Sequence, residues 1–529
     1  MIRIAVSRRA TMTLGLLLGV VPFILCQKVR AAEPSENVAT LPYTISLKEP
    51  FTIEGMPGLH SYCHAHADVD GRKWIFMTGR MNGLHAFFGY FESEKNLEDN
   101  FPSDQAASRI WVVDIAKRKT WSCGLDGLPV SINEQLRSTN AQHVQVDHTL
   151  YIVGGYGYSA SATTNGKMVT FDKLIAVDVP GLVKAIMQSA PIDPYFRQTS
   201  HPALKVTGGN LARLGDSLCL VFGNSFDGLY SPNPDAPGTA FQQQYTEQVR
   251  VFGVEDNPLS IVGLKCYPGK PSSDPRRPYH RRDGNVGPAI APDGKPRIGV
   301  YGGVFVPGQF EAYFEPIYID EFKDDKFSPG IDSSFQQTLN HYECPLLPIF
   351  DSRTADMYTT FFGGMSSFWY DYGRGELIKD SIGIVDGEFI DGVPFIKSIS
   401  TVLHRRNGTS CDYVLPITMP GYLGSAGHLL VDPGVPQHAN GVIRLEALNG
   451  PTTVGHIFGS IESGKPYGSG RGRKGTSPTW ASNKFIEVVV IPGECAVKAV
   501  PLPKTKSDLS SQGARPTPAN GTQRDGEKP

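Results

Sequence analysis

The stretch Tyr358-Thr-Thr-Phe-Phe-Gly-Gly364 runs aromatic and β-branched residues directly into glycine. Such residues favour strands, and glycine at a strand end permits close backbone approach or a positive φ angle. Five further stretches have the same form: Trp74-Ile-Phe-Met-Thr-Gly79, Tyr151-Ile-Val-Gly-Gly155, Leu218-Cys-Leu-Val-Phe-Gly223, Ile298-Gly-Val-Tyr-Gly-Gly303 and Val454-Gly-His-Ile-Phe-Gly459. We call the glycine that directly follows each strand the first glycine of its repeat; the six are Gly79, Gly154, Gly223, Gly302, Gly363 and Gly459. Successive first glycines lie 61 to 96 residues apart, and self-similarity at this scale indicates a repeat protein.

Further strands are predicted around each glycine strand. In the second repeat, residues 141–146 and 149–153 flank Asp147-His148, which predicts a hairpin with a two-residue connection. A later strand is predicted at 109–113, 173–177, 248–252, 316–319 and 484–490. With almost no amphipathic helix, such units bury their faces only against one another. We therefore expect an all-β fold, a six-bladed β-propeller with about four antiparallel strands per blade over residues 43–492.

The ends of this region are expected to meet. A first strand is predicted near Tyr43-Thr-Ile-Ser-Leu47, and the last one includes residues 485–490. If the two strands pair, the first one completes the last blade and removes two exposed sheet edges. The sequence thus predicts that ring closure depends on the N-terminal strand.

The pattern resembles the Kelch repeat of the galactose-oxidase-like superfamily. Trp111-Val-Val-Asp114 and the downstream Trp121 are similar to the second half of a Kelch repeat, and repeats 2, 4 and 5 keep the double glycine. The units are longer than the Kelch norm, which implies inserted loops. The copper site of galactose oxidase needs a specific set of tyrosine and histidine residues, and that set is not matched here residue by residue.

The two chain ends differ from the repeats. Basic residues at Arg3, Arg8 and Arg9 precede the apolar run 14–26, which is too short to span a bilayer, and Val29-Arg-Ala31 offers a cleavage site. We expect residues 1–32 to be a signal peptide, with a signal anchor as the alternative, and the protein to be secreted or periplasmic. Residues 502–529 lack apolar periodicity and are predicted to be a disordered tail.

Charge and cysteine content exclude several classes of protein. Residues 1–32 contain five basic and no acidic residues, so the mature chain is more acidic than the formal net charge of −2 for the whole sequence. Nucleic acid is therefore not expected as a partner, nor is a membrane span after signal cleavage. The seven mature cysteines are an odd number, and no C-x-x-C motif supports a zinc ribbon or a thioredoxin-like site.

The resemblance implies where a site would lie, because inner-strand entrances and long second loops share one face of a propeller. Positions selected in this way are His64, His66, His143, Arg282, Asp283, His341, Glu343 and Trp369. His64-Ala-His66 places two imidazoles on one face of a strand, and His143 from the next unit would complete a three-imidazole site for a divalent metal. The alternative is that these polar residues satisfy backbone groups and water in the channel.

Two other features suggest ligand contacts. The guanidinium group of arginine binds carboxylates through two parallel hydrogen bonds, so Arg281 and Arg282 would suit a sugar acid or an acidic peptide. The alternative is that they form ion pairs with Asp283 or Glu343 and hold adjacent units together. The run Phe368-Trp-Tyr-Asp371 is predicted to be a loop whose flat aromatic faces stack on sugar rings or on neighbouring loops.

No complete catalytic motif accompanies these residues. The sequence contains neither a Gly-x-Ser-x-Gly elbow nor a His-Glu-x-x-His helix. We expect an exported propeller that binds a ligand, carbohydrate or another extracytoplasmic protein, at its central channel mouth. The alternatives are a sugar-active enzyme of the mutarotase, lyase or oxidase type that uses the His/Arg/Glu cluster there, and a structural surface scaffold. A divalent metal is the one cofactor that the residues suggest.

Overall fold

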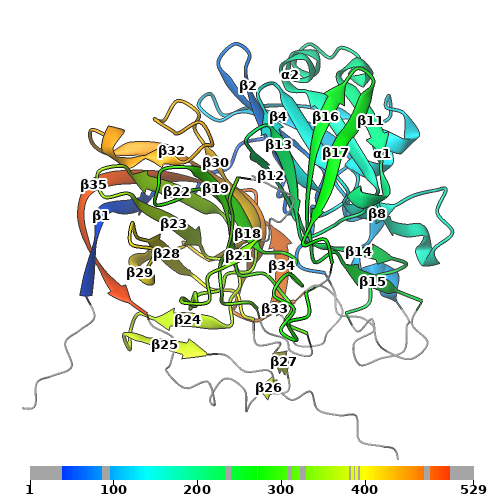
Figure 1. The fold of residues 1–529 in the computed structure, drawn as a ribbon. Coiled ribbons are helices and arrows are strands. Elements are labelled where there is room, and N and C mark those ends of the chain that lie inside the picture. Colours follow the sequence, from blue (N-terminus) through cyan, green and yellow to red (C-terminus); the bar gives the residue numbers. More distant parts are fainter. Residues whose placement is uncertain are drawn as a thin grey trace, which may run out of the picture. The chain divides into compact units, whose positions relative to one another are not determined.

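Small antiparallel β-sheets make up nearly all of the regular structure (Figure 1). In this computed structural model the described residues are 38–85, 96–232, 240–270, 272–307, 312–321, 329–379, 383–385, 388–390, 393–469 and 477–500. The predicted signal peptide, 1–32, and the predicted tail, 502–529, lie outside them. The prediction of an all-β fold is confirmed.

The first four repeats each form a four-stranded meander. Repeat 1 contains β2 (Cys63–Asp68), β3 (Arg72–Met77), β4 (Arg109–Asp114) and β5 (Lys119–Gly124). Repeat 2 contains β6 (Gln142–Val146), β7 (Thr149–Val153), β10 (Lys173–Asp178) and β11 (Phe196–Ser200). Repeat 3 contains β12 (Asn210–Leu214), β13 (Ser217–Val221), β16 (Val249–Asp256) and β17 (Leu259–Tyr267). Repeat 4 contains β18 (Asn285–Ile290), β19 (Pro296–Tyr301), β20 (Ile317–Ile319) and β21 (Gly330–Ile331).

The last two repeats share one larger sheet. Repeat 5 contains β22 (Leu346–Asp351), β23 (Asp356–Phe362), β28 (Ser398–His404) and β29 (Ser410–Thr418). Repeat 6 contains β30 (Tyr422–Val431), β32 (Thr452–Ser463), β35 (Phe485–Ala499) and β1 (Val38–Leu47). A short pairing of β29 with β35 joins the two repeats, and the same sheet includes β31 (Ile443–Arg444), β33 (Gly468–Ser469) and β34 (Ser477–Ala481).

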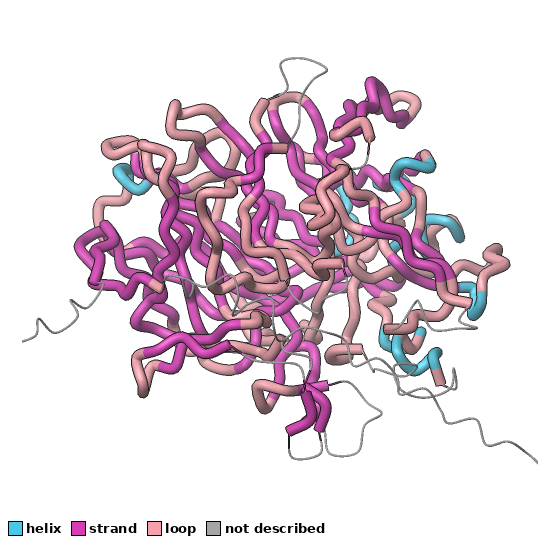
Figure 2. Tube along the Cα trace, turned by 60° about the horizontal axis from the view of Figure 1, so that its bottom comes forward, coloured by secondary structure: helices cyan, strands magenta, loops and turns pink. Residues whose placement is uncertain are grey.

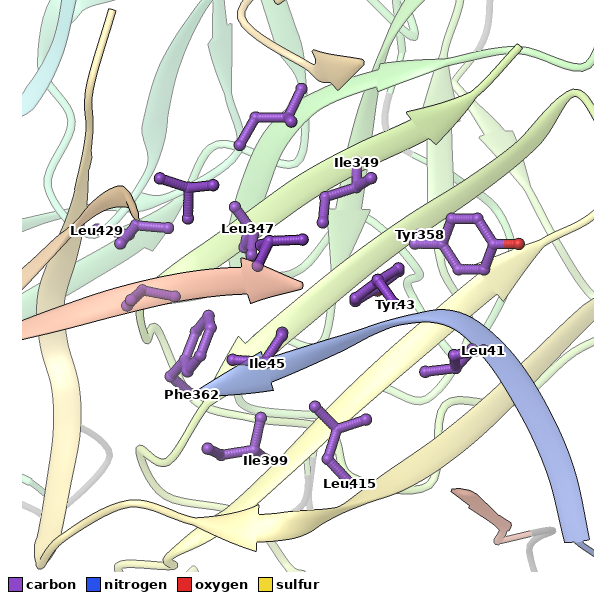
Figure 3. Packing of buried hydrophobic residues seen from close by; sticks show 14 of the residues in the cluster. Leu41, Tyr43, Ile45, Leu347, Ile349, Tyr358, Phe362, Ile399, Leu415 and Leu429 are labelled. Carbon is purple, nitrogen blue, oxygen red and sulfur yellow. The ribbon is translucent and has the colours of Figure 1, made fainter. Parts of the chain in front are cut away.

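The predicted pairing of the chain ends is confirmed. Strand β1 runs antiparallel to β35, with Ile45 opposite Val490. Its inward side chains Leu41, Tyr43 and Ile45 are buried, and they pack against strands of repeat 5 as well as repeat 6. Figure 3 shows this apolar cluster, in which Tyr43 lies beside Tyr358 of β23. The N-terminal strand is therefore part of the last repeat.

The recurrent glycine has a steric cause. All six first glycines have positive φ angles, between 60° and 87°. At Gly154 an added Cβ would lie 2.0 Å from the carbonyl oxygen of Val206, and at Gly459 it would lie 2.4 Å from that of Leu59. Both contacts are with the following repeat in the circular order, so any side chain there would separate neighbouring sheets.

A closed circuit of six backbone hydrogen bonds joins the repeats. Each bond runs from one repeat to its neighbour, and the sixth returns to the starting residue. The amides of Ser61, Ala426, Glu343, Asp283, Gly208 and Asn140 donate in turn to the carbonyl oxygens of Ala426, Glu343, Asp283, Gly208, Asn140 and Ser61. The six lengths are 2.9, 2.7, 2.9, 2.7, 3.3 and 3.3 Å in that order. We call this set the amide circuit. It places one residue from each repeat around a common centre.

Several shorter strands and turns lie outside the six four-stranded units. They are the sheet of β8 (Tyr156–Tyr158), β9 (Met168–Thr170), β14 (Asn224–Asp227) and β15 (Gln242–Tyr245), and the pairs β24 (Phe368–Asp371) with β25 (Glu376–Lys379) and β26 (Gly383–Val385) with β27 (Glu388–Ile390). Short 3-10 turns span Leu97–Asn100, Ser103–Gln105, Asn165–Lys167, Asp193–Tyr195, Pro202–Leu204 and Leu445–Ala447. The prediction that residues 368–371 form a loop is wrong, because alternate side chains are buried and the run pairs with β25.

Two short helices, α1 (Val130–Leu136) and α2 (Val179–Met187), are the α-helices of the described chain and are labelled in Figure 1. Strands and loops make up most of the tube in Figure 2, and the short cyan segments there include the 3-10 turns as well as the α-helices. Helix α2 begins where Asp178 accepts a hydrogen bond from the amide of Gly181, and its apolar side chains, including Leu182, pack on the first two repeats. No helix among the described residues is long and apolar enough to cross a membrane. All seven cysteines from Cys63 to Cys495 are free thiols.

Candidate functional site

Three histidines meet at the inner strands of three neighbouring repeats. His64 lies on β2, His143 on β6 and His428 on β30. Their ring centroids are 4.9 Å apart for His64 and His143, 5.0 Å for His64 and His428, and 5.4 Å for His143 and His428. One ring nitrogen from each lies within 4.8 Å of the other two. We call these residues the histidine cluster.

The amide circuit explains how the cluster forms. His64 and His143 each follow their circuit residue, Ser61 or Asn140, by three positions, and His428 follows Ala426 by two. The circuit thus fixes the three strands at nearly the same level. Burial holds the pKa of His143 at about 3 and that of His428 at about 4, and it lowers the pKa of His64 strongly, with further contributions from the neighbouring imidazoles. The three rings are therefore neutral near pH 7.

The sequence-predicted trio of His64, His66 and His143 is not the one that converges. His66 lies farther along β2, with its ring 5.3 Å from that of Trp74 and with Asp68 and Arg72 nearby. The residue that joins His64 and His143 is His428, which was not predicted from the sequence. Its strand is separated from the sixth glycine strand by residues 432–451 instead of a two-residue turn, so the hairpin pattern that marked other inner strands is missing.

A second group contains charged residues from repeats 4 and 5. The Nε atom of Arg282 lies 3.6 Å from the Oδ2 atom of Asp283. The Asp283 carboxylate also accepts hydrogen bonds from the Tyr342 hydroxyl and, at 3.3 Å, from the side-chain amide of Asn140. The guanidinium of Arg282 lies 5.3 Å from the ring centres of both Phe226 and Phe305. We call Arg282, Asp283, Tyr342 and Glu343 the charged cluster.

Two carboxyl groups of the charged cluster have unusual protonation behaviour. Burial raises the pKa of Glu343 to about 8, and the negative charge of Asp283 adds to the shift. Burial also raises the pKa of Asp283, although Arg282 and Tyr342 oppose this effect. Among the described residues, no donor forms a hydrogen bond to the Glu343 carboxyl group. A protonated acid beside a carboxylate with a fixed cation is an arrangement that can move protons on a ligand.

His341 does not belong to either cluster. Its Nδ1 atom lies 2.6 Å from the carbonyl oxygen of Gly363, and its Nε2 atom lies 2.9 Å from the Ser400 hydroxyl. The ring is fully buried and stacks on Phe361 with centroids 5.4 Å apart. Since both ring nitrogens have protein partners, His341 is a structural residue that links three strands of repeat 5.

Trp369 lines a cavity of about 290 Å³ between repeats 5 and 6. Its walls include the aromatic residues Trp369, Tyr370, Tyr372, Phe395, Tyr422 and Tyr467, with polar groups from Asp371, Lys397, Ser398 and Thr418. The ammonium group of Lys397 lies 4.5 Å from the ring centre of Tyr422. We call this space the aromatic cavity; flat apolar faces beside hydrogen-bonding groups are the surfaces on which sugar rings pack.

Tyr342 connects the charged cluster to residues that line the aromatic cavity. Tyr342 packs in the same apolar group as Met365, Phe395 and Tyr422, and the last two residues line the cavity. The Tyr342 hydroxyl meanwhile contacts Asp283. Tyr342 therefore lies between the Asp283 carboxylate and two residues that line the cavity.

Comparisons with known proteins do not identify this chain. No protein-family model matches it, and no curated protein matches it either.

Proposed function

We propose that this chain is an exported, six-bladed, Kelch-like β-propeller that binds carbohydrate at the mouth of its central channel. The amide circuit supports the six-bladed arrangement, because each of six four-stranded repeats contributes one residue to it. The basic and apolar segments before residue 32 support export. The repeat glycines and Trp111-Val-Val-Asp114 support the Kelch-like assignment.

The aromatic cavity is the observation that carries the proposed ligand class. Its volume of about 290 Å³ suits one or two sugar rings of a longer chain, and its aromatic walls offer faces for stacking. Asp371, Lys397 and Thr418 supply charged and hydroxyl groups for ring hydroxyls. A purely apolar ligand would form no hydrogen bond with the Lys397 ammonium group or the Thr418 hydroxyl, whereas the hydroxyl groups of a sugar would pair with both.

A sugar-active enzyme is the second candidate, and the Asp283–Glu343 pair is the observation that favours it. Glu343, with a pKa of about 8, is protonated at neutral pH and can act as a general acid, while Arg282 can hold an anionic substituent such as a sugar carboxylate. Under this hypothesis, Glu343→Gln abolishes turnover and leaves binding intact.

The test is a binding screen of the purified chain against a panel of neutral and acidic oligosaccharides on a glycan array. The proposal expects saturable binding of at least one structural class. Each bound sugar is then incubated with the protein and followed by NMR, because anomer exchange, elimination or oxidation would favour the enzyme. If the protein binds no glycan on the panel, the carbohydrate proposal is contradicted, and the hypothesis of a structural surface scaffold remains.

A further inference from the structure

We infer that His64, His143 and His428 bind one divalent transition-metal ion of the imidazole-preferring class, with zinc as the expected ion. This site is separate from the proposed carbohydrate site, because it uses none of the residues that line the aromatic cavity. The two proposals can therefore fail independently.

The spacing of the ring nitrogens supports the inference. Three candidate ligand atoms lie within 4.8 Å of one another. Zinc–nitrogen bonds of about 2.0–2.1 Å in a tetrahedral site put ligand nitrogens roughly 3.3 Å apart. Small rotations about the χ1 and χ2 angles bridge this difference, because each ring lies at the end of two rotatable bonds.

Unsatisfied nitrogens are the second observation. The Nδ1 atom of His64 is buried and has no hydrogen-bond partner among the described residues. His341 in the same protein shows the contrasting case, because both of its ring nitrogens are bonded to protein groups. Buried polar atoms normally have partners. A bound ion would supply the partner that the Nδ1 atom of His64 lacks.

The third ligand is already oriented. One ring nitrogen of His428 forms a hydrogen bond with the backbone carbonyl of Tyr62. Tyr62 is itself fixed, since its hydroxyl donates to the carbonyl oxygen of Phe458 at 2.8 Å. Metal-binding histidines usually donate their second N–H to a carbonyl or carboxylate in this way, which fixes the tautomer and aims the other nitrogen at the ion.

The ligand type selects the ion. Three neutral imidazoles without a carboxylate or thiolate suit zinc or copper better than magnesium or calcium, which prefer oxygen ligands. The neighbouring Cys63 thiol is directed at the carbonyl oxygen of Ala141, at 3.7 Å, and does not join the set. Three protein ligands leave a fourth position open, as in zinc sites that bind water or a substrate.

The experiment measures zinc binding to the purified, EDTA-treated full chain by isothermal titration calorimetry and metal analysis. Cobalt substitution reports geometry, because tetrahedral cobalt has intense visible absorption. We expect one equivalent of zinc, and a loss of affinity of at least 100-fold in His428→Ala and in His143→Ala. His66→Ala is the matched control, since His66 is two residues from His64 on the same strand but outside the cluster, and it should change affinity less than threefold.

The other outcomes overturn the inference. Wild-type protein that binds no zinc or copper after EDTA treatment contradicts the site. Equal affinity of wild type and His428→Ala would place the ion elsewhere, and a loss in His66→Ala without a loss in His428→Ala would favour the trio predicted from sequence. Near-UV circular dichroism of each variant checks the fold. If His428→Ala is misfolded, His428→Gln and the cobalt spectrum of His143→Ala decide the question.

Discussion

The backbone amide of Ser61 donates a 2.9 Å hydrogen bond to the carbonyl oxygen of Ala426, and this contact closes the amide circuit between the first and the sixth repeats. The same two repeats are joined by the chain ends, because β1 pairs with β35 in the sixth repeat. Strand β1 completes the sixth repeat as its outermost strand, so the stability of the fold should depend on a strand at the N-terminal end of the described chain.

The first prediction tests this dependence on β1. Leu41 is fully buried in the cluster of Figure 3, whereas the adjacent Thr40 is exposed on the opposite side of the strand. Leu41→Ala should lower the free energy of unfolding by about 2–5 kcal/mol, and Thr40→Ala by less than about 0.5 kcal/mol. Urea unfolding measures both. Equal, small effects would show that β1 is dispensable for the fold.

The second prediction concerns pH. Because the folded-state pKa of Glu343 is raised from 4.5 to about 8, its contribution to stability is complete below pH 4.5 and is lost as the pH rises through 8. The free energy of unfolding should fall by roughly 2–4 kcal/mol over this range on account of Glu343. Asp412, whose buried carboxyl group has a pKa of about 7, contributes in the same direction.

Glu343→Gln isolates the first of these two groups. The amide mimics the protonated acid, so the variant should keep only the part of the pH dependence that Asp412 and Asp283 cause. Urea unfolding between pH 4.5 and 8.5 compares it with the wild type. Identical pH profiles for the two proteins would mean that Glu343 ionises normally in the folded state.

The third prediction concerns the ion pair in the charged cluster. Arg282→Ala leaves the buried Asp283 carboxyl group without its cation, which raises the pKa of Asp283 further and should cost about 3–5 kcal/mol at pH 7. In an Asp283→Asn background the same change should cost much less. A double-mutant cycle gives the coupling energy. A coupling near zero would show that Arg282 acts without Asp283, through its contacts with Phe226 and Phe305 or through a ligand.

The fourth prediction separates His341 from the candidate sites. His341→Ala removes two buried hydrogen bonds and the stacking on Phe361, and it should lower the free energy of unfolding by about 2–4 kcal/mol. The affinity for zinc and for any bound glycan should change less than threefold, provided that the assays are run well below the melting temperature. If the His341→Ala protein is stable but no longer binds zinc or the glycan, His341 contributes directly to ligand binding and this prediction is wrong.

The fold was predictable where the signal is local. A glycine that contacts the next repeat must follow a strand directly, so Gly154 and Gly459 are visible in the sequence itself. The pairing of β1 with β35 followed from the need to cover two edges. Helix α2 was missed because it is short and lies inside a repeat otherwise built of strands.

The candidate site was less predictable, because strand position does not determine where a side chain points. His64 and His341 both lie near the start of an inner strand, yet His64 meets other imidazoles and His341 is buried within repeat 5. His428 was missed since the insertion 432–451 hides its strand from a hairpin pattern. The aromatic run at 368–371 was recognised by composition, although its strand pairing was not.

The most direct test of the proposed function compares two tryptophans. Trp369 lines the aromatic cavity, whereas Trp480 is exposed on β34 and is not among the residues that line it. Calorimetric titration with the tightest-binding oligosaccharide from the glycan panel should show at least a tenfold loss of affinity in Trp369→Ala and less than a twofold change in Trp480→Ala. Equal affinities for wild type and Trp369→Ala, or an equal loss in both variants, would contradict carbohydrate binding in the aromatic cavity.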